Sequence, residues 1–164
     1  MKHLRLCATL LIIFFILTFT AATRQPGTTS HRQAWSSAQT QVEYSSAKSS
    51  ATRPLSDVVR VGNMLYLSGK LGTDSTGKLV SGGIAAETKQ TMENIKSTLE
   101  SNGSSMDHVI KCTVMLADIK ERDEMSSVYA TFFKKERMPA RSAFGTTGLA
   151  LNGRVEIECM AIMK

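Results

Sequence analysis

After residue 53 the spacing of hydrophobic residues changes several times, and each change predicts a new structural element. Apolar residues at every second position, many of them β-branched, indicate strands. Gly62 and Asn63 interrupt the first of these runs and predict a turn. The segments predicted as strands are 58–61, 64–68, 108–117, 141–147 and 153–163, with a short edge strand near 79–80.

A spacing of three and four residues predicts a helix over 85–102, which Gly103 should end. Its polar side chains fall on the other faces, so the apolar stripe should pack against the sheet. The residues of this stripe are Thr88, Met92, Ile95 and Leu99.

A second helix should follow Asp118, which we expect to cap it, with Glu121 completing a capping box. Pro139 blocks its continuation. Its expected buried face consists of Met125, Val128, Tyr129, Phe132 and Phe133.

The order of elements predicts an α/β (α+β) fold, with a mixed β-sheet and two helices packed on one face. A helix between two strands favours a right-handed parallel crossover. The second face carries Met115, Met160 and Ile162 and is too apolar to stay in contact with water. We therefore expect other copies of the chain to cover it, as a closed homotrimer would.

The positive charge of the chain lies mainly in its first 53 residues, which hold six of the 20 Lys/Arg and one of the 14 Asp/Glu. Residues 54–164 are therefore nearly neutral, which argues against a nucleic-acid partner because such binding needs clustered basic side chains. The nearest cluster, Lys134, Lys135 and Arg137, is expected to form the last turn of the second helix.

Residues 1–53 predict a leader. Residues 1–22 join Lys2 and Arg5 to an apolar run that is short for a bilayer span of roughly 20 residues, as in a signal peptide or signal anchor. The Ser/Thr-rich segment 23–53 predicts a disordered linker or a transit-like segment. We expect entry into the secretory pathway, with import into a plastid or mitochondrion as the alternative, and no membrane for the mature domain.

The three cysteines fit no zinc pattern. Cys112 and Cys159 fall within predicted strands, where buried thiols act as small hydrophobic side chains. The sequence also contains no glycine-rich phosphate loop and no Ser-His-Asp set, so neither a metal nor an organic cofactor is expected.

Two regions resemble the RidA/YjgF/UK114 family. VGNMLYLSG at 61–69 is similar to the first hairpin of that family, and PARSAF at 139–144, followed by VEIE at 155–158, is similar to its signature. The resemblance covers 54–164. It implies the chorismate-mutase-like YjgF fold, a homotrimer whose sheets form a central barrel, and sites in the clefts between subunits.

The resemblance also implies hydrolytic deamination of reactive enamine/imine intermediates of the 2-aminoacrylate type, yielding 2-keto acids and ammonia. It implies that Arg141 grips the substrate carboxylate, that Glu156 handles the catalytic water and that Ser68 belongs to the site. Leu55 stands where the family has Tyr, which suggests a more apolar substrate. Ala143 replaces a Cys that contributes mainly through its backbone.

The chemistry of these residues agrees with the implied roles. A planar guanidinium can hold a carboxylate through two parallel hydrogen bonds, and a carboxylate can orient and deprotonate water. Arg141 and Glu156 lie on consecutive predicted strands, and antiparallel neighbours would bring them together, either as a site or as a structural salt bridge. The alternative functions are a non-catalytic trimeric module that binds small carboxylates and, less favoured by the neutral domain, a ribonuclease.

Overall fold

The computed structural model describes residues 41–46 and 54–164. The leader predicted at 1–22 and most of the segment at 23–53 lie outside the described residues. The strands are β1 (Val42–Ser45), β2 (Val58–Val61), β3 (Met64–Leu67), β4 (Lys70–Leu71), β5 (Val109–Leu116), β6 (Ala140–Gly145) and β7 (Val155–Ile162), and the α-helices are α2 (Gly83–Ser101) and α3 (Arg122–Ala130).

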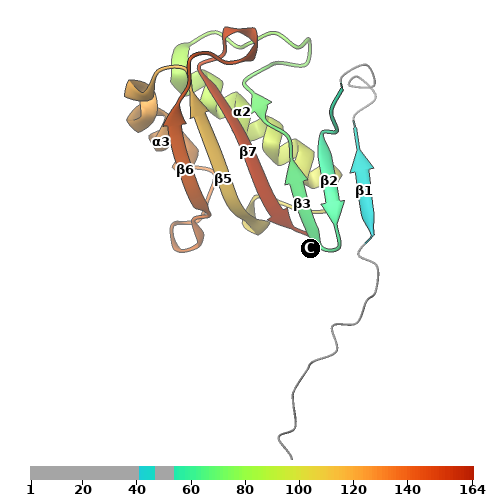
Figure 1. The fold of residues 1–164 in the computed structure, drawn as a ribbon. Coiled ribbons are helices and arrows are strands. Elements are labelled where there is room, and N and C mark those ends of the chain that lie inside the picture. Colours follow the sequence, from blue (N-terminus) through green and yellow to red (C-terminus); the bar gives the residue numbers. More distant parts are fainter. Residues whose placement is uncertain (1–40, 47–53) are drawn as a thin grey trace, which may run out of the picture. The chain divides into compact units, whose positions relative to one another are not determined.

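The strands form one mixed sheet in the order β1-β2-β3-β7-β5-β6, and β4 pairs with β7. β5 and β6 are parallel, and the other pairs are antiparallel. Both α-helices cover the same side of the sheet, which we call the helix face, and leave the other side, the open face, uncovered (Figure 1). The predicted mixed sheet with two helices on one face is therefore confirmed.

The core lies between α2 and the centre of the sheet. Every residue of the predicted α2 stripe is fully buried. The alternate residues of β7 that face the stripe are also buried, because side chains of a strand point to its two faces in turn. These residues are Val155, Ile157, Cys159 and Ala161. Gly103 follows α2 with φ 77°, a left-handed conformation that glycine adopts without strain, so the predicted end of this helix is also confirmed.

Along β5, buried residues alternate regularly with less buried ones only from Cys112 onward. A β-bulge lies between Val109 and Lys111, and it leaves Ile110 exposed while Val109 is buried. One extra residue reverses the alternation on its far side, so the regular alternation expected along 108–117 is broken at Ile110.

The start of the second helix also differs from its prediction. Asp118 does act as a cap, because its Oδ1 accepts a hydrogen bond from the backbone N–H of Lys120, at 2.9 Å, but it caps a short 3₁₀ turn that precedes α3. Glu121 does not complete a capping box, because its carboxylate is paired with the Arg154 guanidinium. The predicted capping box was therefore wrong, since a distant arginine competes successfully for the same carboxylate.

α3 ends at Ala130, well before Pro139. Within its predicted buried face Met125 and Tyr129 are buried, and the other three residues are only partly buried. The basic cluster does not form the last turn of α3, since Lys134 lies beyond the helix and pairs with Asp107 at 2.8 Å. That prediction was wrong.

β1 was not predicted, because its residues belong to the segment expected to be a linker. All four of its residues are exposed, and it pairs with β2 at the edge of the sheet. The edge strand predicted near 79–80 is reduced to a single bridge between Thr73 and Leu79. In the part of the chain that the structure describes, no helix is long and apolar enough to span a membrane.

Candidate functional site

Arg141 and Glu156 are not neighbours within one chain, because β5 separates their strands. Arg141 lies opposite Cys112, and Cys112 lies opposite Cys159. These three positions share one face, and Glu156 is three residues from Cys159 on a strand whose side chains alternate. Arg141 and Glu156 therefore point to opposite faces of the sheet. The expected contact between them was wrong, both as a site and as a salt bridge within one chain.

Arg141 lies on the helix face at the β6 edge of the sheet, supported by an aromatic ring. Its Cζ lies 4.9 Å from the centroid of the Tyr129 ring, within the range of a cation–π interaction. The Tyr129 hydroxyl is buried without a hydrogen-bond partner, and burial, together with the nearby Cys112 thiol, raises the pKa of Tyr129. No hydrogen bond or ion pair within the described part of the chain occupies the guanidinium. Its N–H groups are thus available to an anion.

Ala143 lies two residues further along β6 on the same side of the strand, where it is half-buried against the core. Its methyl group is small and leaves the backbone beside Arg141 accessible. We call Arg141, Ala143 and Tyr129 the arginine half-site.

Glu156 lies half-buried on the open face, against the backbone of Gly69. A Cβ added at residue 69 would overlap the Glu156 carboxylate, so the absence of a side chain at this position creates the space that the carboxylate occupies. Gly69 follows β3 and precedes β4, which pairs with β7 at Glu156. Two segments far apart in sequence therefore define the position of one carboxylate.

Ser68 precedes Gly69 and is hydrogen-bonded to the segment that follows Leu55. The Ser68 hydroxyl donates to the Ser56 carbonyl at 2.6 Å, and the Ser68 N–H donates to the Asp57 carbonyl at 3.1 Å. Because its proton is used internally, the Ser68 hydroxyl can only accept a hydrogen bond from a ligand. Leu55 is the neighbouring residue and is 45% exposed.

A buried ion pair fixes the same segment. The Lys70 Nζ lies 2.7 Å from the Asp57 Oδ1, and both side chains are at most 16% exposed. The pair connects the residues after Leu55 to those after Gly69. We call Leu55, Ser68, Gly69 and Glu156 the carboxylate half-site.

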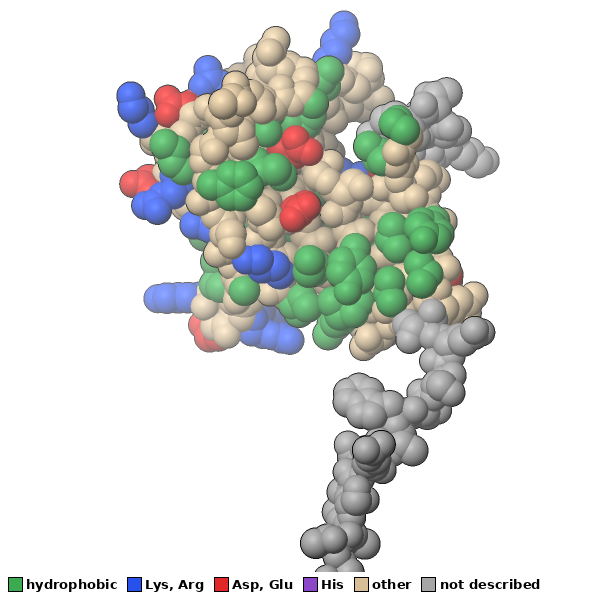
Figure 2. All heavy atoms as spheres, viewed as in Figure 1, with side chains coloured by type: hydrophobic (Ala, Val, Ile, Leu, Met, Phe, Trp, Pro, Cys, Tyr) green, Lys and Arg blue, Asp and Glu red, His purple; other side chains and the backbone are tan. Residues whose placement is uncertain are grey.

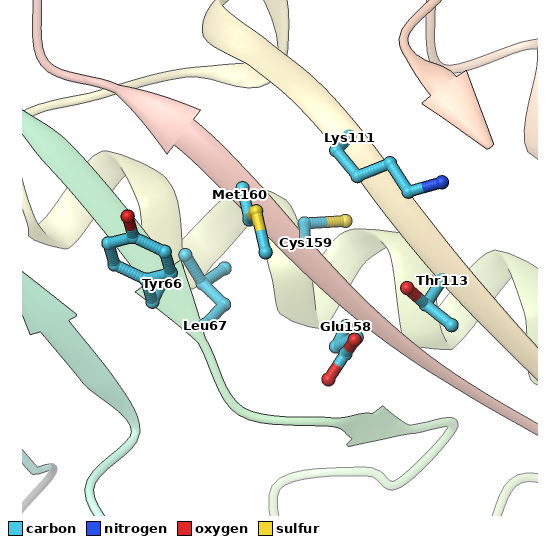
Figure 3. A pocket seen from close by; sticks show the side chains of 7 residues that line it. All are labelled: Tyr66, Leu67, Lys111, Thr113, Glu158, Cys159 and Met160. Carbon is cyan, nitrogen blue, oxygen red and sulfur yellow. The ribbon is translucent and has the colours of Figure 1, made fainter. Parts of the chain in front are cut away.

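The centre of the open face is a shallow hollow that contains none of the predicted site residues. Its lining is Tyr66, Leu67, Lys111, Thr113, Glu158, Cys159 and Met160, as Figure 3 shows. Hydrophobic side chains gather on this face beside a few carboxylates (Figure 2). Tyr66, Phe144 and Met160 are each more than a third exposed there. The open face therefore exposes hydrophobic side chains, as the sequence led us to expect, and charged side chains such as Lys111 and Glu158 lie beside them.

The sequence patterns did not identify Tyr129 and Gly69 as residues of the half-sites. Tyr129 was assigned to the core from its spacing, and only its packing reveals the contact with Arg141. Gly69 lies in the hairpin motif, but its closeness to Glu156 depends on the pairing of β4 with β7. Among the described residues, no three His, Cys, Asp or Glu side chains are grouped so that they could hold a metal ion.

Comparisons of this chain with protein families, with curated proteins and with solved structures agree with one another. A family model described as Endoribonuclease L-PSP matches residues 45–163. The human 2-iminobutanoate/2-iminopropanoate deaminase is 41% identical over 113 residues, which are 68% of this chain and 82% of that protein. Reactive Intermediate Deaminase A, chloroplastic, from Arabidopsis thaliana is 33% identical over 146 residues, 88% of this chain and 78% of that protein. The crystal structure of RidA from an Antarctic Psychrobacter is 34% identical, with a TM-score of 0.65, and the match covers 76% of this chain and 98% of that one.

Replacement of Tyr129 tests its support of Arg141. Tyr129→Phe keeps the ring and removes only an unpartnered hydroxyl, so binding of a small carboxylate should stay within about two-fold. Tyr129→Leu removes the ring, and binding should weaken by about 2- to 30-fold, as loss of a cation–π interaction implies. Isothermal titration calorimetry would measure both affinities. Equal affinities for the two variants would show that the ring does not support Arg141.

Gly69→Ala tests whether the backbone at Gly69 positions the Glu156 carboxylate. The side chain of Glu156 is flexible and can move aside, so the protein should fold with a nearly unchanged melting temperature. A reaction rate that depends on the Glu156 carboxylate should fall by about 100-fold, because a misplacement of about 1 Å is costly. In a double-mutant cycle, Gly69→Ala should slow Glu156→Gln no further. An additive loss would show that Gly69 acts independently of Glu156.

Proposed function

The chain belongs to the RidA/YjgF family, whose matching model is described as Endoribonuclease L-PSP, and we propose that it hydrolyses reactive 2-imino acids and their enamine tautomers to 2-keto acids and ammonia. Relatives at about 40% identity are named 2-iminobutanoate/2-iminopropanoate deaminases. The observation that carries the proposal is the pair of prepared half-sites, with a guanidinium held over a ring and a carboxylate held over a glycine.

The proposed reaction uses one arginine, one carboxylate and water. The enamine tautomerises to the imine, and the two parallel N–H groups of Arg141 bind its carboxylate. Glu156 orients a water molecule, accepts its proton and directs the oxygen to the imine carbon. Glu156 returns this proton to the nitrogen, which gives the neutral aminoalcohol. The hydroxyl proton is then transferred to the nitrogen through Glu156, the C–N bond breaks as the C=O bond forms, and ammonia and a 2-keto acid are released. Positioning of the substrate and the water supplies most of the acceleration.

We propose that the complete site forms between two copies of the chain in a homotrimer. Arg141 and Glu156 face away from each other in a single copy, so one small molecule cannot reach both of them there. The β6 edge of one copy beside the open face of the next would join the two half-sites. The exposed hydrophobic side chains of the open face support this arrangement, because an apolar patch of this kind is typical of an interface.

Leu55 and Ala143 adjust the pocket without taking part in the chemistry. Leu55 is exposed beside Ser56, whose carbonyl accepts from the Ser68 hydroxyl, so its side chain can contact the part of the substrate away from the carboxylate. A leucine there favours an apolar substrate side chain. Ala143 offers its backbone next to Arg141, a contribution that does not require the thiol of the usual cysteine.

The destination of the chain is a separate proposal. The relative from Arabidopsis thaliana is named chloroplastic, and its match extends over 146 residues of this chain. This favours the transit-like interpretation of the leader, and thus import into a plastid, over entry into the secretory pathway.

The deaminase proposal predicts distinct kinetic effects for the two half-sites. With 2-iminobutanoate generated by a dehydratase, Arg141→Ala should raise KM by about 10- to 100-fold, because hydrogen bonds to a charged group are lost. Glu156→Gln should lower kcat by about 100-fold or more. Glu158→Gln, on the same strand and outside both half-sites, is the matched control. Release of 2-oxobutyrate and ammonia measures each rate.

The binding-module alternative makes the opposite prediction. Leu55 in place of tyrosine is the feature that favours it. In that case the purified protein would bind 2-oxobutyrate with Arg141-dependent affinity but would release no ammonia above the rate in buffer, and the deaminase proposal would be overturned.

Mixed assemblies test the site between copies. With the substrate kept well below the KM of Arg141→Ala, this variant and Glu156→Gln should each be nearly inactive alone. They should recover activity when they are co-expressed, because about a quarter of randomly formed sites would hold both native residues. Native mass spectrometry would confirm that the subunits had mixed. If both residues belonged to the same copy at each site, mixed assemblies would stay as inactive as the separate variants.

A further inference from the structure

Cys112 and Cys159 form a buried thiol pair at the centre of the sheet. They lie directly opposite each other on β5 and β7, and their Sγ atoms are 2.7 Å apart, which is close for two sulfur atoms that are not bonded. Their exposed fractions are 0% and 2%. The two residues are 47 positions apart in the sequence, so their contact depends entirely on the pairing of these strands.

The backbone geometry of this pair suits a disulfide. Residues directly opposite in an antiparallel ladder have Cα atoms about 4.5–5.5 Å apart, within the range of about 4.4–6.8 Å that disulfides require. Both side chains point to the helix face, so their sulfur atoms can approach each other without a change in the pairing of the strands.

We propose that Cys112 and Cys159 are a redox modification site and form a cross-strand disulfide when a disulfide donor such as oxidised glutathione is present. The proposal is independent of the deaminase function, because neither thiol belongs to a half-site. It also differs from the sequence-based interpretation of the two cysteines as separate buried hydrophobic residues.

The environment assigns different roles to the two thiols. A hydrogen bond from the Cys159 thiol, helped by the charge of Arg141, lowers the pKa of Cys112. The same hydrogen bond and burial raise the pKa of Cys159. Cys112 is therefore the better nucleophile, since the thiolate is the reactive form.

The disulfide forms by thiol–disulfide exchange in two steps, and atoms and electrons balance over both steps. Because Cys112 is fully buried, the first step requires a local opening that exposes it. In that opened form the Cys112 thiolate attacks one sulfur of glutathione disulfide, which forms a mixed disulfide and releases one glutathione thiolate. Cys159 then loses its proton and attacks the Cys112 sulfur, which forms the cross-strand bond and releases the second glutathione. The protein gives up two electrons and two protons, and glutathione disulfide becomes two glutathione molecules.

The bond would connect the two central strands of the sheet. β5 separates the strand of Arg141 from the strand of Glu156, and α3 places the Tyr129 hydroxyl close to the Cys112 thiol. Because the linked residues enclose a long loop, the disulfide should stabilise the fold by restricting the unfolded chain.

Peptide mapping tests the proposal directly. Full-length protein is equilibrated in glutathione buffers of increasing oxidised fraction, the exchange is quenched, and free thiols are alkylated after denaturation. Trypsin should release 112–120 (CTVMLADIK) joined to 155–164 (VEIECMAIMK), a species that dithiothreitol separates. Both peptides recovered with alkylated cysteines from the oxidised samples, or carrying only glutathione, would overturn the proposal.

Thermal unfolding provides a second measurement with matched variants. The melting temperature of the wild-type protein should rise by more than about 5 °C in the oxidised buffer, and dithiothreitol should reverse the change. Cys7→Ser should behave like the wild type, whereas Cys159→Ala and Cys112→Ala should show no shift. If either alanine variant fails to fold, the peptide map of the wild-type protein decides the question.

Discussion

The antiparallel pairing of β5 with β7 is the constraint on which the rest of the structure depends. It buries the alternate residues of both strands under α2 and places two cysteines in contact. It also puts β5 between the signature motif around Arg141 and the one around Glu156. The same pairing that completes the core therefore keeps the two motifs apart within one chain, and a site that uses both of them must draw on a second copy.

Each half-site is prepared by its own local structure. The ring of Tyr129 holds the guanidinium at the sheet edge, and the bare backbone of Gly69 provides room for a carboxylate. The buried pair of Lys70 and Asp57 fixes the segment beside Leu55. Association of the copies would therefore require little further ordering, because the side chains that would contact a substrate already have defined positions.

The sequence predicted the elements whose pattern is local. The α2 stripe, the turn at Gly62 and the alternation along β7 follow from spacing and side-chain chemistry alone. Three features escaped because they depend on partners distant in sequence. The bulge beside Ile110 could not be predicted, because both possible faces of the strand carry apolar residues. Glu121 pairs with Arg154 and so does not form the expected capping box. The strand order places β5 between β6 and β7, which are consecutive in the chain.

The opposite orientation of the guanidinium and the carboxylate has a consequence for the life of a single molecule. In the proposed assembly, a newly made or transported copy that has not yet met its partners carries both chemical groups and yet no complete catalytic centre. Catalytic activity would begin when the copies assemble rather than when each copy folds. Dilution of the protein within a compartment would therefore abolish the activity by dissociating the copies, although each copy would stay folded.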